Sequence, residues 1–175
     1  MIYGAPTKGS DGLYFVKVLD DDKKKKFIQL NRTKNLTLTS QSEVTINLDS
    51  EKNMQKVQDI NELNIKTAVE NSAEWFGKEL PEDVVRAAYT ASLVNDELTC
   101  DRIPQTRVFN SNQEAVDISK LKSENTCTVI LELAGIWFAK KAFGPVWNLV
   151  QVKVCDDPDV QDLYPEEYII ADDDQ

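Results

Sequence analysis

Hydrophobic and polar residues alternate with a period of two in the N-terminal part of the chain. Residues 13–19 place Val16 and Val18 on one face and Phe15 and Lys17 on the other, which is the pattern of a half-buried β-strand. Further alternating stretches follow at residues 27–30, 36–40 and 43–48. The charged run at residues 20–26 separates the first two stretches and suits a hairpin turn, with residues 27–30 as the return strand.

Two longer stretches near the C-terminal end are the strongest strand patterns in the sequence. Residues 125–138 alternate as far as the Ala-Gly pair at 134–135, where a bulge would bend the strand and reset its register. Residues 145–154 form the second stretch, which alternates cleanly from Val150. We therefore expect a long hairpin whose tip carries the Lys-Lys pair at 140–141.

The middle of the chain changes to the spacing of an amphipathic helix. From a candidate N-cap at Asp49 or Ser50, apolar residues recur every three or four positions as far as Gly77. Gly77 is expected to end the helical region, which we expect to be broken near residues 61–66. A second, shorter helix is predicted after Pro81, because proline suits the first turn.

These patterns predict one mainly β (α+β) domain over residues 1–155, with an α-helical insertion around residues 50–93. Residues 106–110 and 115–121 have weaker patterns that fit either a strand or a loop. Residues 156–175 are expected to form an acidic tail that lies outside the domain.

The net charge of −10 at first argues against nucleic acid as a partner, because phosphate binding depends on Lys and Arg. The distribution of the charge changes this inference. Residues 156–175 carry a net charge of −9, whereas residues 1–155 together carry only −1. Within this larger part, residues 1–35 carry a net charge of +4. A locally positive surface on the domain is therefore compatible with the composition.

The sequence lacks the residues that most enzyme and metal sites need. It contains no histidine, its three cysteines are far apart, and no Gly-rich phosphate loop is present. We therefore expect a protein that is not an enzyme and that holds no metal and no cofactor. No apolar run is long enough to span a bilayer and the N-terminus has no export signal, so we expect an intracellular protein that is not secreted.

The stretch GIWFAKKAFGPVW, residues 135–147, bears most directly on function. Its four aromatic residues surround the Lys-Lys pair, and they either fill a core or stack on the bases of a ligand whose phosphates meet the lysines. The grouping of rings with cations favours the second interpretation. The candidate nucleic-acid-binding residues are Phe15, Lys17, Arg32, Lys34, Trp137, Lys140, Lys141, Phe143, Trp147 and Lys153.

Two stretches of the sequence resemble a known family. WFGKEL at residues 75–80 and GIWFAKKAFGPVWNLVQVKV at residues 135–154 are similar to OB-fold single-stranded-DNA-binding proteins of nucleocytoplasmic large DNA viruses and phages. The resemblance implies an OB-fold-like antiparallel barrel with an α-helical insertion and an acidic C-terminal tail. It also implies a viral protein of DNA replication or recombination that coats unwound DNA while its tail contacts polymerase or helicase.

The residues and the resemblance together predict single-stranded DNA binding without sequence specificity, through aromatic stacking and Lys and Arg contacts to phosphates. The alternative is a structural or virion protein that uses the aromatic hairpin as a packing interface between copies. The candidate partners are single-stranded DNA, replication proteins that bind the acidic tail, and further copies of the chain in a homo-oligomer. For a viral protein, the expected location is the host nucleus or a cytoplasmic replication site.

Overall fold

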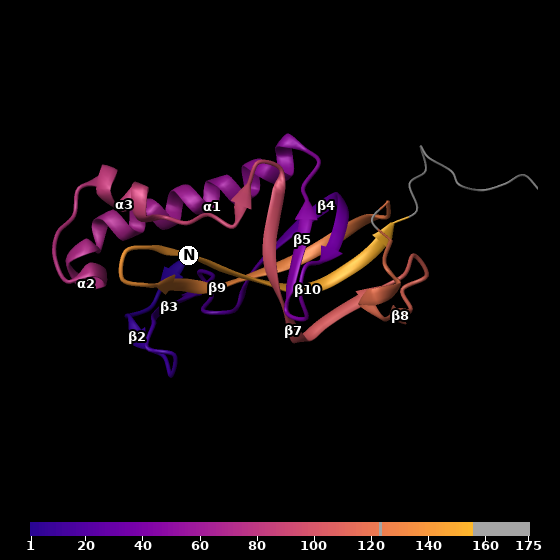
Figure 1. Ribbon diagram of the computed structural model, residues 1–175, viewed down its shortest axis with the longest axis horizontal. Helices are drawn as coiled ribbons and strands as arrows, with labels where there is room; N and C mark the ends of the chain where they lie inside the picture. The colour runs from indigo at the N-terminus through magenta and orange to yellow at the C-terminus, as the bar shows by residue number, and fades with distance from the viewer. Residues whose placement is uncertain (123, 156–175) are drawn as a thin grey trace, which may run out of the picture.

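The structure is a computed structural model that describes residues 1–122 and 124–155 (Figure 1). The predicted acidic tail, residues 156–175, lies outside the described residues. The strands are β1 (Ile2–Tyr3), β2 (Thr7–Lys8), β3 (Tyr14–Leu19), β4 (Lys26–Leu38), β5 (Glu43–Asn47), β6 (Leu93–Val94), β7 (Glu97–Phe109), β8 (Ala115–Val116), β9 (Thr126–Phe138) and β10 (Phe143–Cys155). The helices are α1 (Glu51–Glu70), α2 (Ser72–Phe76) and α3 (Glu82–Ala88), with one 3-10 turn at Ile118–Lys120.

Five of these strands pair in a closed cycle. β4 pairs with β5, β5 with β7, β7 with β10, β10 with β9, and β9 pairs again with β4. Every one of these pairs is antiparallel except β7 with β10, which is parallel. The other strands are attached to this cycle. β3 pairs with β9, and both β1 and β2 pair with β3. β6 and β8 pair with β7. The prediction of a mainly antiparallel β structure with helices is therefore confirmed.

The long hairpin predicted from the sequence is the β9–β10 pair. Val146 lies opposite Gly135 and Trp147 lies opposite Leu133, so Ala134 has no partner across the pair. This irregularity is the bulge predicted at residues 134–135, and it is confirmed. The bulge bends the strand without turning its core face outward, because Leu133 and Ile136 on either side of it are both buried.

β3 and β4 lie one after the other along the same edge of β9. Phe15 of β3 lies opposite Trp137, and Phe27 of β4 lies opposite Glu132, with both strands antiparallel to β9. The charged run between them protrudes as a turn, and β3 and β4 share only an isolated bridge between Leu19 and Lys25. The expected two-stranded hairpin is therefore wrong, because β9 offers both strands a longer partner than they offer each other. Residues 27–30 and most of 36–40 belong to one strand, β4, which has a register shift between Leu30 and Thr33.

Helix α1 runs without interruption through residues 61–66, so the predicted break there is wrong. Asn61 and Asn64 lie on the buried face of this segment, and each is satisfied by a hydrogen bond. The Tyr3 hydroxyl donates to Asn64 Oδ1 at 2.7 Å, and the Tyr89 hydroxyl donates to Asn61 Oδ1 at 2.6 Å. Burial raises the pKa of Tyr3 to about 12 and also raises the pKa of Tyr89, so both phenols stay protonated and keep donating at neutral pH.

An aromatic cluster holds the helices over one face of the β9–β10 tip. Phe138 and Phe143 stack across the hairpin, with ring centroids 5.6 Å apart and an interplanar angle of 6°. Phe76 of α2 meets both rings edge-on at 5.6 and 5.3 Å, and Trp75 packs on Phe138 at 5.6 Å. Figure 1 shows the helices together on one side of this half of the sheet. The hairpin tip therefore has a core face toward the helices and an opposite, outer face.

We expect Gly135→Ala to destabilise the fold, because a β-carbon at this position would overlap both the Phe15 ring and the backbone oxygen of Val16. Backbone cannot move aside as a flexible side chain does, so the free energy of unfolding should fall by about 1–3 kcal/mol, as in other overpacked sites. Urea unfolding measures this decrease. Gly9→Ala is the control, since its β-carbon would approach most closely only the flexible Asp11 carboxylate. Equal stability of the two variants would contradict the close approach of β3 to β9.

Candidate nucleic-acid interface

The alternation of β3 and β9 places two of the predicted aromatic residues on the outer face of the sheet. Val16 and Ile136 are completely buried on the helix side. Phe15 is next to Val16 in sequence and Trp137 is next to Ile136, so both point to the opposite face. Phe15 and Trp137 are also cross-strand partners. Both are only half-buried. Two aromatic side chains thus lie side by side on a surface that the helices do not cover.

Glycines provide the space in which these two rings lie. A β-carbon on Gly135 would overlap the Phe15 ring, and a β-carbon on Gly144 would lie 3.1 and 3.2 Å from two ring atoms of Trp137. Each ring therefore rests against the backbone of the neighbouring strand. One side of each ring is supported by the sheet, and the other side is left toward solvent.

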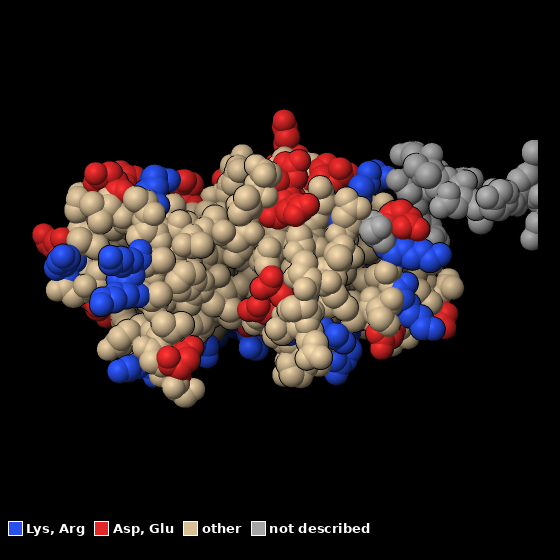
Figure 2. All heavy atoms as spheres, viewed as in Figure 1, with Lys and Arg blue, Asp and Glu red and all other residues tan. Residues whose placement is uncertain are grey.

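The predicted lysines lie around this aromatic pair and along the same outer face. Lys17 is exposed and lies opposite Gly135, two residues from Phe15. Lys153 is exposed farther along the outer face, opposite Thr128. Lys140 and Lys141 are exposed at the hairpin tip. In Figure 2, basic side chains gather at the left end of the molecule, over α2 and the β9–β10 tip, while acidic ones follow the upper edge.

Two predicted rings are not part of this surface. Phe143 is 0% exposed in the aromatic cluster, and Trp147 is 2% exposed opposite the buried Leu133. Phe143 pairs with Phe138, which alternation turns inward next to the outward Trp137, and Trp147 lies four residues after Phe143 in β10 and so faces the same way. The prediction that bases stack on Phe143 and Trp147 is therefore wrong, because these two rings fill the core.

The remaining predicted residues, Arg32 and Lys34, are exposed in the middle of β4. They line a cleft with the start of α1, far along β9 from the hairpin tip. The structure therefore does not bring all predicted cations together. It divides them between the tip, the outer face and this separate cleft.

Phe27 belongs to the outer face and was missed by the sequence analysis. Its side chain is 48% exposed, although it is a large apolar residue paired with β9 near the start of β4. It lies opposite Glu132, whose carboxylate accepts from Lys25 Nζ at 3.2 Å and from Asn148 Nδ2 at 3.2 Å. The alternation of residues 27–30 was the available signal, because it places Phe27 on one face of the strand and Leu30 on the other. That signal was not used because the stretch was interpreted only as a return strand.

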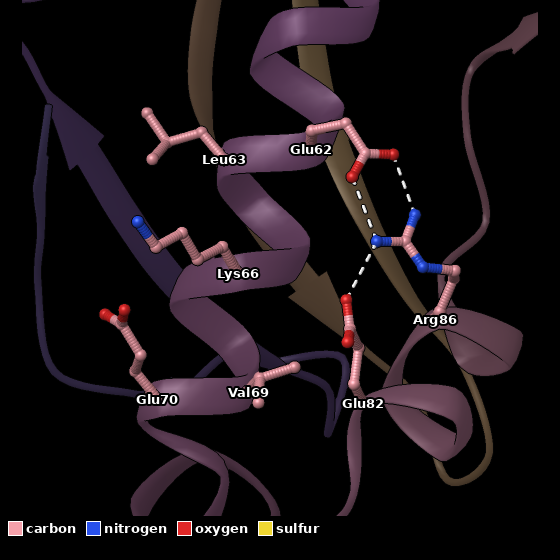
Figure 3. Close-up of a pocket in the computed structure, with 7 residues that line it drawn as sticks. All are labelled: Glu62, Leu63, Lys66, Val69, Glu70, Glu82 and Arg86. Carbon is pink, nitrogen blue, oxygen red and sulfur yellow. Dashed lines mark hydrogen bonds and ion pairs between the residues drawn. The ribbon is translucent and has the colours of Figure 1, made fainter.

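Two other clefts lie near the helices. One, of about 520 Å³, lies between α1 and α3, where Arg86 is held by Glu62 at 2.7 and 2.9 Å and by Glu82 at 3.2 Å (Figure 3). Figure 3 shows this guanidinium turned toward the two carboxylates, which neutralise it, so the cleft is a poor site for phosphate. The other, of about 640 Å³, lies on the helix side of the tip, where Tyr14 and Lys140 line it.

Within residues 1–122 and 124–155, no group of three or more His, Cys, Asp or Glu side chains is placed to hold a metal ion. None of the helices described by the structure has the length and apolar character needed to cross a membrane.

Comparison with known proteins places this geometry among related folds. A family model described as "Family of unknown function (DUF5871)" matches residues 34–172. No curated protein matches the chain in sequence. In structure, the chain is similar to the single-stranded DNA-binding protein from bacteriophage Enc34, with a TM-score of 0.51, 10% identity and 97% of each chain covered. A C-terminal truncation of that phage protein gives a TM-score of 0.50 at 10% identity, covering 87% of this chain and 95% of the other.

Substitution of the two hairpin tryptophans should separate core from surface. Trp147→Ala removes a fully buried ring, so we expect the free energy of unfolding to fall by about 3–5 kcal/mol. Trp137→Ala, the matched variant on the outer face of the same hairpin, should cost clearly less because its ring is only half-buried. Chemical denaturation followed by circular dichroism measures both. Similar decreases for the two variants would contradict the assignment of their faces.

Proposed function

The chain belongs to the DUF5871 family, and we propose that it binds single-stranded DNA without reading its sequence. The observation that carries the proposal is the pair of half-buried aromatic residues, Phe15 and Trp137, side by side on the outer face of β3 and β9. Soluble proteins usually bury such rings, so adjacent aromatic side chains on an uncovered sheet face indicate a ligand.

The chemistry of this surface suits an unpaired strand. Each base has a π-face that stacks on an aromatic ring, and a stacked base contributes about 1–3 kcal/mol to binding. Lys17 beside Phe15, and Lys140 and Lys141 at the tip, supply cations for the phosphates that link the bases. A duplex hides its base faces, so the aromatic pair favours single strands.

The fold supports the same proposal. The closed cycle of β4, β5, β7, β10 and β9 is consistent with the five-stranded barrel of OB-folds, which bind oligonucleotides on one sheet face and its loops. The likeness to the phage Enc34 protein, whose name states that it binds single-stranded DNA, is consistent with this assignment of the fold. We propose that the chain is a non-enzymatic binding protein of DNA replication or recombination, with residues 1–155 as its DNA-binding domain.

We expect Phe15→Ala and Trp137→Ala each to weaken binding of oligo-dT, by about 1–3 kcal/mol for each base that no longer stacks. Fluorescence anisotropy with labelled oligo-dT and with a duplex of the same length measures this effect. Binding of the duplex should be weaker from the start and should change less. Circular dichroism of each variant shows whether its fold is intact.

Tyr14→Ala is the matched control, because Tyr14 precedes Phe15 in the same strand, faces the other side and is 48% exposed. Its affinity for oligo-dT should stay close to that of the wild type. Equal weakening by Tyr14→Ala and Phe15→Ala would move the site to the cleft on the helix side. Unchanged oligo-dT affinity, together with loss of self-association in Phe15→Ala, would instead support a packing interface between copies.

The lysines at the tip should contribute through charge alone. Lys140→Glu with Lys141→Glu should weaken oligo-dT binding at low salt and reduce the slope of log K against log salt by about 0.7 for each phosphate that is no longer bound. Titrations at several salt concentrations measure the slope. An unchanged slope would remove the hairpin tip from the binding surface.

A further inference from the structure

A second cationic site lies where the middle of β4 meets the start of α1. The cleft there has a volume of about 460 Å³ and is lined by four basic side chains, those of Arg32, Lys34, Lys52 and Lys56. One carboxylate, that of Asp49, lines the cleft as well. The lining therefore carries a clear excess of positive charge, on a domain whose overall charge is close to neutral.

Interactions within the cleft leave donors available for an anion. Lys34 Nζ lies 3.1 Å from Asp49 Oδ2, and Lys56 Nζ donates to the backbone oxygen of Gln29 at 2.8 Å. An ammonium group has three N–H donors, so each of these lysines retains others. Lys52 is exposed in the first turn of α1.

The backbone holds Arg32 in an uncommon conformation. Its φ is 57°, in the left-handed region, and it lies in the register shift between Leu30 and Thr33. The buried Thr33 hydroxyl donates to the backbone oxygen of Cys127 at 2.9 Å, which ties this irregularity to β9. Such a conformation costs free energy for a residue with a side chain, and bulges of this kind redirect side chains. Here the redirected side chain lines the cationic cleft.

The remaining groups of the cleft also match those that bind phosphate oxygens. Phosphates are bound by Arg and Lys, by Ser, Thr and Asn side chains, and by the amides at helix N-termini. Ser50, Asn31 and Thr126 line this cleft, and α1 begins there with its first turn of amides, of which that of Asn53 donates to Ser50 Oγ at 3.1 Å.

We infer that this cleft binds backbone phosphates of the same DNA strand that stacks on Phe15 and Trp137. The inference rests on the proposed function and extends its site, adding Lys52 and Lys56 as phosphate-binding residues and Phe27 as a stacking residue between the two ends. Nucleic acid is favoured because four cations, side-chain hydroxyl and amide groups and helix amides meet at one place on the surface.

The topology places the two ends of this site on one line. β3 and β4 follow each other along the edge of β9, so Phe15, Phe27 and Gln29 occupy successive outer-face positions that lead to Arg32. Thr126 at the cleft and Trp137 at the aromatic pair lie in the same strand, at most about 36 Å apart at the usual rise of a β-strand. A short oligonucleotide therefore covers one end only, whereas a longer one reaches both.

The experiment compares oligo-dT of about 4 and about 16 nucleotides, the limits of site size for one OB-fold. In the full chain, Lys52→Glu should weaken binding of the longer oligonucleotide several-fold and reduce its salt slope by about 0.7, while the shorter one binds as before. Lys66→Glu is the matched control, because Lys66 is an exposed lysine of the same helix in the acidic cleft of Figure 3. It should change neither affinity.

Arg32→Gly is a second variant that keeps the fold, since glycine accepts the positive φ without strain while the guanidinium is removed. It should repeat the length-dependent weakening. If both variants bind the longer oligonucleotide as well as the wild type or more tightly, the inference is overturned. Tighter binding would indicate that the acidic segment 156–175, and not DNA, binds in the cleft. Equal weakening of the binding of both oligonucleotides would overturn it too, because the cleft would then belong to the site that binds the short oligonucleotide. Failure of the wild type to bind either length would instead overturn the proposed function itself.

Discussion

The stacking of Phe138 on Phe143, closed by the edge of Phe76, decides which face of the hairpin is core. Because side chains alternate across a strand, burying Phe138 turns Trp137 outward, and pairing of β3 in register with β9 turns Phe15 outward beside it. A slip of one residue would exchange the two sets of rings. The register is protected against this by Gly135 and Gly144, whose missing side chains admit the outer rings and no others. The outer surface thus follows from the packing under the helices.

Charge acts locally in this molecule. A net charge of −10 is compatible with binding an anion because the excess carboxylates lie in residues 156–175 and the cations of the domain are grouped. Where a carboxylate does occur on the outer face, at Glu132, it is compensated by Lys25 and Asn148. At physiological ionic strength a charge is screened beyond about 8 Å, so the identity of the nearest groups matters more than the sum over the chain. The cleft at the start of α1 shows the same principle, since one carboxylate there faces four cations.

Sequence periodicity predicted the local elements better than their partners. The β9–β10 hairpin and its bulge were visible because alternation, the Ala-Gly pair and the tip residues all lie within one continuous stretch. The placement of β3 and β4 along β9 was not visible, since it depends on pairing between strands that lie far apart in the sequence. β7, with its parallel partner β10, was largely missed because its buried and exposed residues do not alternate simply along the strand and its pairing with β10 contains a register shift. The unbroken α1 was missed because sequence alone does not show that the buried Asn61 and Asn64 have hydrogen-bond partners in the distant Tyr89 and Tyr3.

The candidate site, like the fold, was predicted only where its residues lie close together in the sequence. Sequence alone grouped four hairpin rings with the nearby lysines, yet alternation allows only some of those rings to face solvent, and Trp137 alone of the four is not buried. On the outer face Trp137 is accompanied by Phe15 and Phe27, which lie there because two separate strands follow each other along β9. An extended ligand suits such a line better than a compact one does, since successive weak interactions along a strand add up only when one chain of ligand meets them all. Aromatic residues at one end, and at the other a cationic cleft that a register shift lets Arg32 line, are consistent with the proposed surface for a flexible polyanion.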